Sequence, residues 1–238
     1  MKHVIAVMQP YFLPYIGYWQ LIKKVDEFVI YDNIEFTKKG WFNRNRFLVN
    51  GEDALFTVAI KSDSDSLSVS ERYLAESFDR EKLLRRFESS YRKTPYFKQH
   101  FPVIQNIVRF PSNNLFLYLL NSIREICAFL EIKTQITIAS QVPLDHEAFK
   151  GQAKIIEICR QLKATAYINP IGGLDLYRAE DFQKNNIRLG FLKAQPVPYA
   201  QFDHEFVSFL SILDLMMFNS RDQMINLLEA YEQIEPKI

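Results

Sequence analysis

The chain has 238 residues, of which 48% are hydrophobic, so it is long enough to bury a sizeable core. Its 29 lysines and arginines almost balance its 28 aspartates and glutamates, which leaves a formal charge of +1. This balance excludes the strong basic excess that holds proteins on nucleic acid, so no nucleic-acid partner is expected. The longest apolar runs are far shorter than the ~18–20 residues of a membrane span, so no integral membrane segment is expected either.

The cysteines and histidines give no sign of a metal centre. Cys127 and Cys159 lie far apart on predicted helices, without the CxxC spacing of a zinc site, and the four histidines show no ligand spacing. Unpaired core cysteines are typical of the cytosol, and the apolar run from Val4 to Met8 is too short for a signal peptide. P-loop, α/β-hydrolase and complete dinucleotide motifs are missing from the sequence. We therefore expect a cytoplasmic protein with no metal and no cofactor.

The N-terminal part of the chain predicts a mixed α/β start. Apolar residues form one continuous run and then recur at helical spacing, which is the pattern of a β-loop-α-β unit. A turn-rich tetrapeptide from Asn50 to Asp53 then separates two β-prone runs, which predicts a hairpin. The predicted elements are a strand at 4–8, a helix at Tyr15 to Val25, a strand at Phe28 to Tyr31, and hairpin strands at Phe47 to Val49 and Ala54 to Ile60.

The stretch from about 79 to 130 is helical in pattern and predicts a three-helix subdomain. Each helix has its own start signal, either a capping side chain or a proline in the first turn. The predictions are Arg80 to Tyr91 capped by Asp79, Tyr96 to Arg109 started by Thr94-Pro95, and Leu115 to Leu130 capped by Ser112 or Asn113.

Strands and helices alternate again after residue 130, which favours a parallel sheet. The whole sequence therefore predicts one α/β domain over residues 1–238, with a mixed, largely parallel sheet, flanking helices and the helical insertion. The later elements are predicted as a strand at Gln135 to Ala139, a helix at Gln152 to Leu162, strands at Ala166 to Ile168 and near Arg188 to Leu192, and helices at Ser208 to Met217 and Ser220 to Tyr231.

The segment from Gln9 to Tyr18 links the first predicted strand to the first helix. Two prolines stiffen it, and ligands of open α/β sheets collect at this carboxyl edge, where helix N-terminal amides favour anions. Gln9, Tyr11 and Tyr18 are therefore candidate substrate-binding residues. A rigid structural turn, in which Gln9 bonds to the backbone, is the alternative interpretation.

The segment after the second strand, residues 31–46, concentrates charges and amides. Asp32 follows the strand directly, so it should lie at the same sheet edge as Gln9 if the two strands are parallel. Cations beside Trp41 and Asn43 can clamp a phosphate, a carboxylate or a sugar ring. A solvated basic loop is the alternative, although the tryptophan and the asparagines fit that interpretation less well. The cations are Lys38, Lys39, Arg44 and Arg46.

Four blocks of the sequence resemble the signature blocks of the WbqC-like family, and the resemblance spans nearly the whole chain. The family is associated with bacterial surface-polysaccharide (O-antigen) gene clusters, so the resemblance implies a role in making or decorating an activated sugar. The sequence departs from the commonest pattern at Glu35 and at Asn169-Pro170. The blocks are Gln9-Pro10-x-x-Leu13-Pro14-x-x-Gly17-Tyr18, Asp26-x-Phe28-Val29-x-Tyr31-Asp32, Phe36-x-Lys38-x-x-Trp41-x-Asn43-Arg44-Asn45 and Tyr167-Ile168-Asn169-Pro170-x-Gly172-Gly173.

The last of these blocks forms a loop after a predicted strand. Gly172 and Gly173 permit close backbone approach to a ligand, although a tight turn explains them equally well. With the family resemblance, Asn169, Gly172 and Gly173 become candidate substrate-binding residues. We expect this loop to form the far wall of the pocket that the first two loops begin.

The leading functional hypothesis is a transferase that moves an acyl, aminoacyl or glycosyl group onto a sugar intermediate. Its small-molecule substrate would be a phosphorylated or nucleotide-activated sugar. Asp32 and Lys38 are the candidate catalytic residues, with Asp32 as general base and Lys38 on donor phosphates. A non-catalytic sugar-phosphate binding or assembly protein is the alternative from another class. Nucleotidyl transfer is a further alternative, weakened by the lack of HxGH-type histidines.

One geometric expectation can be checked directly. Gln9, Asp32, Lys38, Asn43 and Arg44 should line a single concave pocket at the carboxyl edge of the sheet. Trp41 and the amides would orient the acceptor, and Arg44 would grip a planar anion through parallel hydrogen bonds. The alternative for Arg44 is a structural role in which its guanidinium ties the loop to backbone carbonyls.

Overall fold

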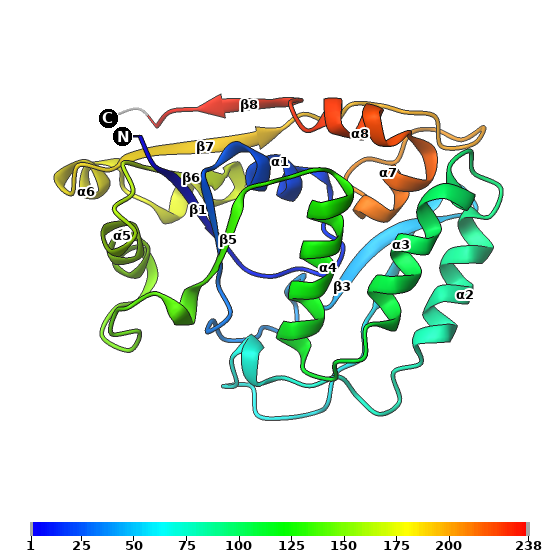
Figure 1. Cartoon of the computed structure of the whole chain (residues 1–238), viewed down its shortest axis with the longest axis horizontal. Coiled ribbons are helices and arrows are strands. Elements are labelled where there is room, and N and C mark those ends of the chain that lie inside the picture. Colours follow the sequence, from blue (N-terminus) through cyan, green and yellow to red (C-terminus); the bar gives the residue numbers. More distant parts are fainter. Residues whose placement is uncertain (1, 237–238) are drawn as a thin grey trace.

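Six strands form one sheet at the centre of the computed structural model, which describes residues 2–236 (Figure 1). The strand order is β5-β2-β1-β6-β7-β8, with every neighbouring pair parallel except β7 and β8. The mixed, largely parallel α/β sheet expected from the sequence is confirmed. Its strands are β1 (Val4–Met8), β2 (Glu27–Ile30), β5 (Gln135–Ile138), β6 (Ala166–Pro170), β7 (Arg188–Ala194) and β8 (Tyr231–Ile234).

Both faces of the sheet are buried, because its strands alternate their side chains between two hydrophobic clusters. In β1, Val4 and Ala6 belong to the larger cluster, whereas Ile5 and Val7 belong to the smaller one. This alternation follows from the two-residue period of a strand, and burial on both sides explains why the strands read as continuous apolar runs. The chain therefore forms three layers, with helices on both sides of the sheet.

Two short helices cover the smaller cluster, and the remaining helices lie on the other side of the sheet, where α2, α3 and α4 run side by side (Figure 1). The smaller cluster is covered by α5 (Gly151–Gln161) and α6 (Ala179–Lys184). The other helices are α1 (Ile16–Lys24), α2 (Arg80–Tyr91), α3 (Phe97–Arg109), α4 (Leu115–Phe129), α7 (Ile212–Phe218) and α8 (Arg221–Leu227).

The three helices predicted between 79 and 130 are present, with one change of capping residue. Asp79 caps α2 as expected, since its carboxylate accepts a hydrogen bond from the Lys82 amide at 2.8 Å. The cap of α4 is Asn114 rather than Ser112 or Asn113, because the Asn114 side chain reaches the Leu117 amide at 3.0 Å. Ser112, Asn113 and Asn114 are all residue types that cap helices, so residue type alone does not identify the N-cap of α4. The register of the turn decides which of the three side chains reaches the amides of the helix.

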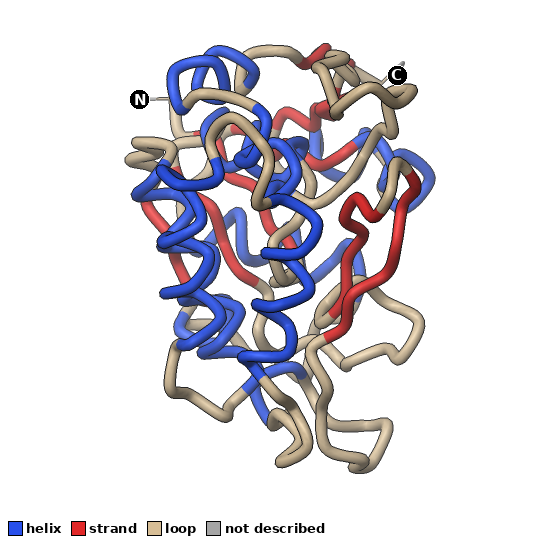
Figure 2. The backbone as a smooth tube through the Cα atoms, turned by 90° about the vertical axis from the view of Figure 1, so that its right-hand side faces the viewer, coloured by secondary structure: helices blue, strands red, loops and turns tan. Residues whose placement is uncertain are grey.

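The predicted hairpin is also present and lies apart from the main sheet, packed against α2 (Figure 2). Its strands are β3 (Arg44–Val49) and β4 (Glu52–Thr57), which pair in antiparallel register from Arg44 with Thr57 to Val49 with Glu52. Asn50 and Gly51 form the two-residue turn with φ of 52° and 84°, the left-handed values that a tight hairpin of this kind requires. β3 ends at Val49 as predicted but begins earlier, at Arg44, whereas β4 lies closer to the N-terminus than the predicted range of Ala54 to Ile60.

The C-terminal elements differ most from the prediction. The two expected helices are shortened to α7 and α8, and Tyr231, which was expected to end the second helix, begins β8 instead. This short strand covers the edge of β7 in antiparallel register. Helix α6 and three short 3₁₀ segments at 69–71, 139–141 and 171–176 were not expected. Elements of so few residues carry too little periodicity to be distinguished from loops by sequence.

A buried carboxylate joins these C-terminal elements to α2. Asp214 in α7 is fully buried and accepts hydrogen bonds from Tyr91 at 2.9 Å, Tyr199 at 2.6 Å and Gln201 at 2.7 Å. Burial raises the pKa of Asp214, although the three donors act in the opposite direction. The Tyr91 hydroxyl also accepts the Leu48 amide of the hairpin at 2.8 Å. One polar cluster thus holds helix, hairpin and C-terminal segment together.

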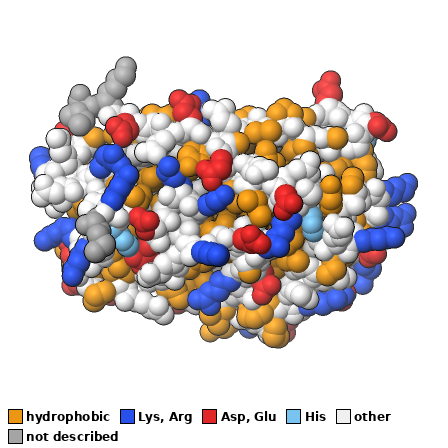
Figure 3. Space-filling view, turned by 45° about the horizontal axis from the view of Figure 1, so that its top comes forward, with side chains coloured by type: hydrophobic (Ala, Val, Ile, Leu, Met, Phe, Trp, Pro, Cys, Tyr) orange, Lys and Arg blue, Asp and Glu red, His pale blue; other side chains and the backbone are white. Residues whose placement is uncertain are grey.

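The surface carries no broad field of one sign on the face seen in Figure 3. Basic and acidic side chains are interspersed over most of it, with hydrophobic side chains between them. This mixture agrees with the near-zero net charge of the sequence. Within residues 2–236, no helix has the length and apolar character needed to cross a lipid bilayer.

Candidate functional site

The topology of the sheet places a crevice between β1 and β6. From β1 the chain moves outward to β2 through α1, whereas from β6 it moves in the opposite direction to β7 through α6. The strand order therefore reverses between β1 and β6. Open α/β sheets bind ligands at such a switch point, beyond the carboxyl ends of the strands. Gln9 follows β1 and Asn169 lies near the end of β6, so both are at this position.

A cavity of about 490 Å³ opens at this switch point. Its volume lies in the range of small-molecule sites. Gln9, Tyr11, Asn169, Gly172 and Gly173 all line it, so the structure brings together candidate residues from the first and the last loops. The other lining residues are Val7, Met8, Tyr31, Ile34, Gly151, Gln152, Ile155, Pro170, Leu176 and Tyr177.

Gln9 is fixed in this cavity by two tyrosines. Its side-chain carbonyl accepts a hydrogen bond from the Tyr11 hydroxyl at 2.8 Å, and its backbone carbonyl accepts one from the Tyr18 hydroxyl at 3.0 Å. Tyr18 is buried and does not line the cavity, so it positions Gln9 from behind. The Gln9 amide group, whose carbonyl is oriented by Tyr11, keeps its NH₂ donors for a ligand.

The loop that carries Gln9 and Tyr11 is clamped at Leu13. This residue has φ of 47°, a left-handed value that is uncommon for a branched side chain. Its carbonyl accepts hydrogen bonds from the Asn45 side chain at 2.9 Å and from the Ser211 hydroxyl at 2.7 Å. The Phe12 amide also bonds to the Phe42 carbonyl at 2.9 Å. Residues 42–45 therefore shape the first loop of the site without entering the cavity.

Asn169 forms the opposite wall with two tyrosines. Its side-chain carbonyl accepts a hydrogen bond from Tyr167 at 3.0 Å, and the Tyr167 and Tyr177 hydroxyls lie 3.3 Å apart. Gly173 makes room for this arrangement, since a Cβ there would lie 2.0 Å from the Asn169 amide nitrogen. By contrast, a Cβ on Gly172 would meet no atom within 4 Å. Gly173 is thus required for the packing of Asn169, whereas Gly172 faces open space.

The N-terminus of α5 also faces the cavity through Gly151 and Gln152. Lys150 at the N-cap makes no side-chain capping bond, so the first amides of this helix have no side-chain acceptor there. The Gln152 side chain is engaged elsewhere, donating to Asp181 at 2.9 Å and accepting from the Arg178 amide at 2.6 Å. Free amides at a helix N-terminus favour a negatively charged group of a ligand.

The side chains that line the cavity are neutral. They are apolar groups, amides and phenols, without a carboxylate, imidazole, thiol or ammonium group. Burial raises the pKa of Tyr11 to about 12, and it also raises the pKa of Tyr31 and Tyr177. These phenols stay protonated near neutral pH and act as hydrogen-bond donors and acceptors. Such a lining suits a ligand rich in hydroxyl groups.

Asp32 lies behind this cavity and is buried. Its carboxylate accepts a hydrogen bond from the Ser140 amide at 2.9 Å. The buried Lys154 of α5 lies over the Tyr31 ring, 5.1 Å from its centre, and donates to the His146 carbonyl at 3.1 Å. Burial lowers the pKa of Lys154, and the charge of Asp32 partly restores it. Asp32 therefore faces Lys154, and not Lys38 or Arg44 as expected.

Lys38 and Arg44 do not reach the cavity. Lys38 is exposed and pairs with Asp65 at 2.7 Å, because its loop projects into solvent. The Arg44 guanidinium donates to the Gly40 carbonyl at 2.9 Å and also to the Lys39 carbonyl, which is the structural alternative stated for it. Asn43 is buried and donates to the Val58 carbonyl at 2.7 Å. The expectation of one pocket containing all five residues therefore does not hold: Gln9 lines it and the other four do not.

Trp41 lines a separate, smaller cavity of about 240 Å³. Tyr11 lines both cavities, so the two adjoin at this residue. Arg44 lies over the Trp41 ring, 5.4 Å from its centre. The other residues lining the smaller cavity are Pro14, Tyr15, Asn45, Arg46 and Phe209.

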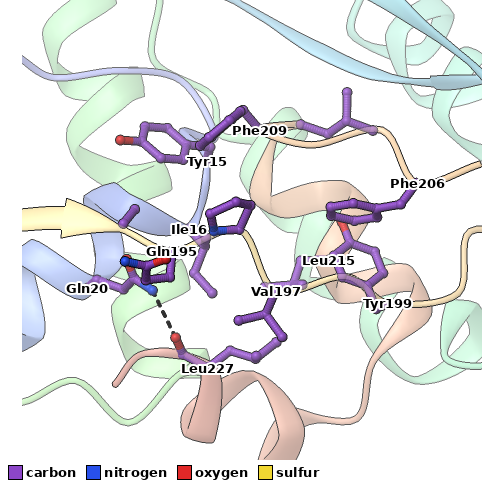
Figure 4. A pocket seen from close by; sticks show the side chains of 13 residues that line it. Tyr15, Ile16, Gln20, Gln195, Val197, Tyr199, Phe206, Phe209, Leu215 and Leu227 are labelled. Atoms are coloured by element: carbon purple, nitrogen blue, oxygen red, sulfur yellow. Dashed lines mark hydrogen bonds between the residues drawn. The ribbon is translucent and has the colours of Figure 1, made fainter. Parts of the chain in front are cut away.

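A third cavity, of about 40 Å³, lies beneath Tyr15 and Phe209 (Figure 4). Gln20 reaches into its wall and donates to the Leu227 carbonyl at 2.9 Å and to the Ala230 carbonyl at 3.0 Å, while its own carbonyl oxygen is buried without a partner. A space of this size has room for a water molecule or two, which suits that unpaired oxygen. It is too small for a metabolite, so it is not a substrate site.

Sequence reasoning missed the contributions of Tyr31 and of the start of α5 to the cavity. Tyr31, Gly151 and Gln152 were not selected, although Tyr31 follows directly after β2. The start of α5 would have been found by noting that this helix leads from β5 into β6, which puts its N-terminus at the carboxyl edge. Over residues 2–236, no group of three or more His, Cys, Asp or Glu side chains is arranged to hold a metal ion.

An open, largely parallel sheet with a ligand-sized cavity at its switch point defines the class of this α/β protein. More particularly, the chain belongs to the WbqC-like protein family, whose pattern matches residues 9–226. It is 27% identical over 216 residues to the uncharacterized protein Rv1507c of Mycobacterium tuberculosis, and the match covers 89% of this chain and 92% of that protein. No solved structure matches the chain.

Proposed function

We propose that this protein is a transferase that binds an activated sugar in the cavity between β1 and β6 and acts in the synthesis of a bacterial surface polysaccharide. The observation that carries the proposal is the neutral lining at the switch point of the sheet, where three amides and three phenols stand among apolar side chains. Amide and phenol groups both donate and accept, so they can pair with sugar hydroxyls in either sense. Membership of the WbqC-like family supports the polysaccharide pathway.

The arrangement also has a place for the charged part of such a substrate. The uncapped N-terminus of α5 faces the same cavity, and its amides favour a phosphate group. Phosphate binding is thereby assigned to backbone amides of α5 and not to Lys38 or Arg44. Lys154 lies behind Tyr31, where its ammonium group adds positive potential to this side of the cavity.

Catalysis by such a site would rest on orientation. Holding donor and acceptor in a reactive geometry can supply about 7–11 kcal/mol of the barrier without an acid or base of the protein. Gln9 and Asn169 stand on opposite walls, held by Tyr11 and Tyr167, and they would fix the sugar between them. The neutral lining is equally compatible with binding alone, so a non-catalytic sugar-phosphate binding protein is the second candidate.

Calorimetry with UDP-glucose, UDP-N-acetylglucosamine and dTDP-glucose tests the binding part. Gln9→Ala and Tyr177→Phe should each weaken binding of the preferred probe by roughly 2–12-fold, the value of one neutral hydrogen bond. Gln99→Ala, which removes an exposed amide of α3, should leave binding unchanged. Absence of binding by all three probes, or binding that is insensitive to Gln9 and Tyr177, would contradict the proposal.

Mass spectrometry separates the two candidates. The protein is incubated with the bound sugar nucleotide and the small-molecule fraction of a bacterial extract. A transferase should either add mass to the sugar nucleotide or release its nucleotide, and Gln9→Ala should slow this change. Tight binding without either change would establish the binding protein instead.

A further inference from the structure

The smaller cavity, here called the aromatic annex, is a preformed space beside the main cavity. It measures about 240 Å³ and shares Tyr11 with its larger neighbour. Tyr11 thus stands between the two spaces, and a ligand that occupied both would pass this residue. Four of the seven lining residues are aromatic, and the full set is Tyr11, Pro14, Tyr15, Trp41, Asn45, Arg46 and Phe209.

Trp41 is held in place while much of its ring stays in solvent. Trp41 is 45% exposed, and the Arg44 guanidinium lies over its ring at 5.4 Å from the ring centre. Arg44 is in turn tied to the carbonyls of Gly40 and Lys39. Contact with a guanidinium that is itself hydrogen-bonded limits the rotation of the indole, and a side chain ordered before binding costs less entropy as a stacking surface.

The other walls of the annex are fixed as firmly. The Asn45 side chain bonds to the Leu13 carbonyl at 2.9 Å, and the Ser211 amide bonds to the Arg46 carbonyl at 2.9 Å. Phe209 has φ of 57°, an uncommon backbone value for an aromatic residue, and half of its side chain remains exposed beside Tyr15 (Figure 4). Gly17 lets the Tyr15 ring fold back, since a Cβ there would lie 2.5 Å from that ring.

Several polar groups of the annex are already engaged within the protein. The Asn45 amide donates to Leu13 and accepts from the Arg46 backbone at 2.8 Å. The Arg46 guanidinium pairs with Asp53 at 3.0 Å. The Asn45 side chain and part of the Arg46 guanidinium are therefore not free to pair with the hydroxyls of a sugar ring, and a buried hydroxyl without a partner is costly. A planar heteroaromatic ring has apolar faces that stack on aromatic side chains and needs few edge partners.

We propose that the annex binds the base of a nucleotide-activated sugar whose sugar part occupies the main cavity. The inference rests on the proposed function and narrows it, because it selects a nucleotide-linked substrate over a simple sugar phosphate. Trp41 is the stacking surface for the base, and Arg44 is the residue that holds Trp41. The annex thus gives a function to the segment whose cations do not reach the main cavity.

Tryptophan fluorescence gives a direct test, because the protein has two tryptophans in contrasting places. Trp19 is fully buried, with its indole nitrogen donating to the Pro14 carbonyl at 3.1 Å, so a stacking base can quench Trp41 alone. Titration with UDP, dTDP, ADP and GDP should quench the emission saturably for at least one of them. Pyrophosphate, ribose 5-phosphate and free glucose are the base-free probes and should not quench it.

Variants show whether the base stacks on Trp41. Trp41→Ala should weaken binding of the quenching nucleotide about tenfold, within the range for one base on one aromatic ring. Trp41→Phe should abolish the fluorescence change while calorimetry still detects binding within a few-fold of the original affinity. Arg44→Lys keeps the charge but loses the planar brace and its paired hydrogen bonds to the Gly40 and Lys39 carbonyls, so both nucleotide affinity and thermal stability should fall. Tyr73→Ala removes an exposed aromatic residue elsewhere and is the matched control.

Two outcomes overturn the annex proposal. One is the absence of quenching and binding by all four nucleotides up to millimolar concentration. The other is nucleotide binding that Trp41→Ala leaves unchanged, or quenching by ribose 5-phosphate or glucose as strong as that by the nucleotides. If sugar nucleotides bind through Gln9 but not through Trp41, the annex proposal fails and the proposed function stands. If nucleotides bind through Trp41 but sugar nucleotides do not bind at all, Trp41 is a stacking surface for a base, and both the proposed function and the assignment of a sugar nucleotide to the two cavities fail.

Discussion

Replacement of Gly173 by alanine tests how the far wall of the main cavity is built. A Cβ at this position would lie 2.0 Å from the Asn169 amide nitrogen and 3.2 Å from its Cγ, so the Asn169 side chain must leave its place. Two hydrogen bonds are then lost, one from Tyr167 to Asn169 at 3.0 Å and one from Asn169 to the Pro170 carbonyl at 3.1 Å. At ~0.5–1.5 kcal/mol each, the free energy of unfolding should fall by about 1–3 kcal/mol.

Gly172→Ala is the matched control, because a Cβ there meets no atom within 4 Å. It should change the stability by no more than about 0.5 kcal/mol. In urea unfolding followed by circular dichroism, Gly173→Ala should lower the midpoint by roughly 0.3–1 M for a slope near 3 kcal/mol/M, while Gly172→Ala should not move it. Sugar-nucleotide affinity should fall in parallel for Gly173→Ala, since Asn169 lines the cavity.

A double-mutant cycle isolates the contact. Asn169→Ala removes the same two hydrogen bonds, so Gly173→Ala should cost almost nothing further in that background. The expected coupling is therefore close to the full cost of Gly173→Ala alone. The reasoning is refuted if Gly173→Ala is no more destabilising than Gly172→Ala, or if it costs as much without Asn169 as with it.

Three further substitutions test the supporting structure. Asn45→Ala removes one of the two donors to Leu13 and should lower stability by ~1–3 kcal/mol in thermal or urea unfolding; the exposed Asn106→Ala should not. Burial raises the pKa of Asp214 in the folded state, so its favourable contribution is present below about pH 4 and declines as pH rises through the folded pKa. The stability of Asp214→Asn relative to the wild type should therefore improve with rising pH, and a difference independent of pH would contradict this assignment. Lys154→Met leaves Asp32 without its buried cation, so urea unfolding should show a clear loss of stability at pH 7, and Asp32→Asn in the same chain should recover part of it.

The sheet was predictable from sequence because its strands are buried on both faces. Runs such as Val4 to Met8 are almost entirely apolar, and their alternation with helices at 16–24 and 151–161 indicates parallel order. β8 was missed because it is a short edge strand with two exposed side chains in its middle, directly after a helix. The residues of β8 alone do not distinguish this strand from the end of a helix. Only the pairing of β8 with β7 identifies it as a strand.

The site was predictable at its first and last loops and not in its middle. Gln9 follows β1 and Asn169 lies near the end of the neighbouring strand β6, so the rule of the carboxyl edge places both at the cavity. Asn43 and Arg44 are of residue types that often bind ligands. In this structure, however, both side chains donate hydrogen bonds to backbone carbonyls of nearby segments. Whether an amide or a guanidinium binds a ligand or a backbone carbonyl depends on contacts between distant segments of the chain. Residue type and spacing in the sequence do not reveal those contacts.

The double hydrogen bond to the Leu13 carbonyl has a consequence for synthesis of the protein. Ser211, one of its two donors, lies 198 residues further along the chain. The strands and helices of the N-terminal half can begin to form while the chain emerges from the ribosome, because translation exposes them first. The loop bearing Gln9 and Tyr11 obtains its second anchor only when Ser211 has emerged and folded back. The first loop of the site to be translated thus obtains its full set of anchors only after Ser211 has folded back against it.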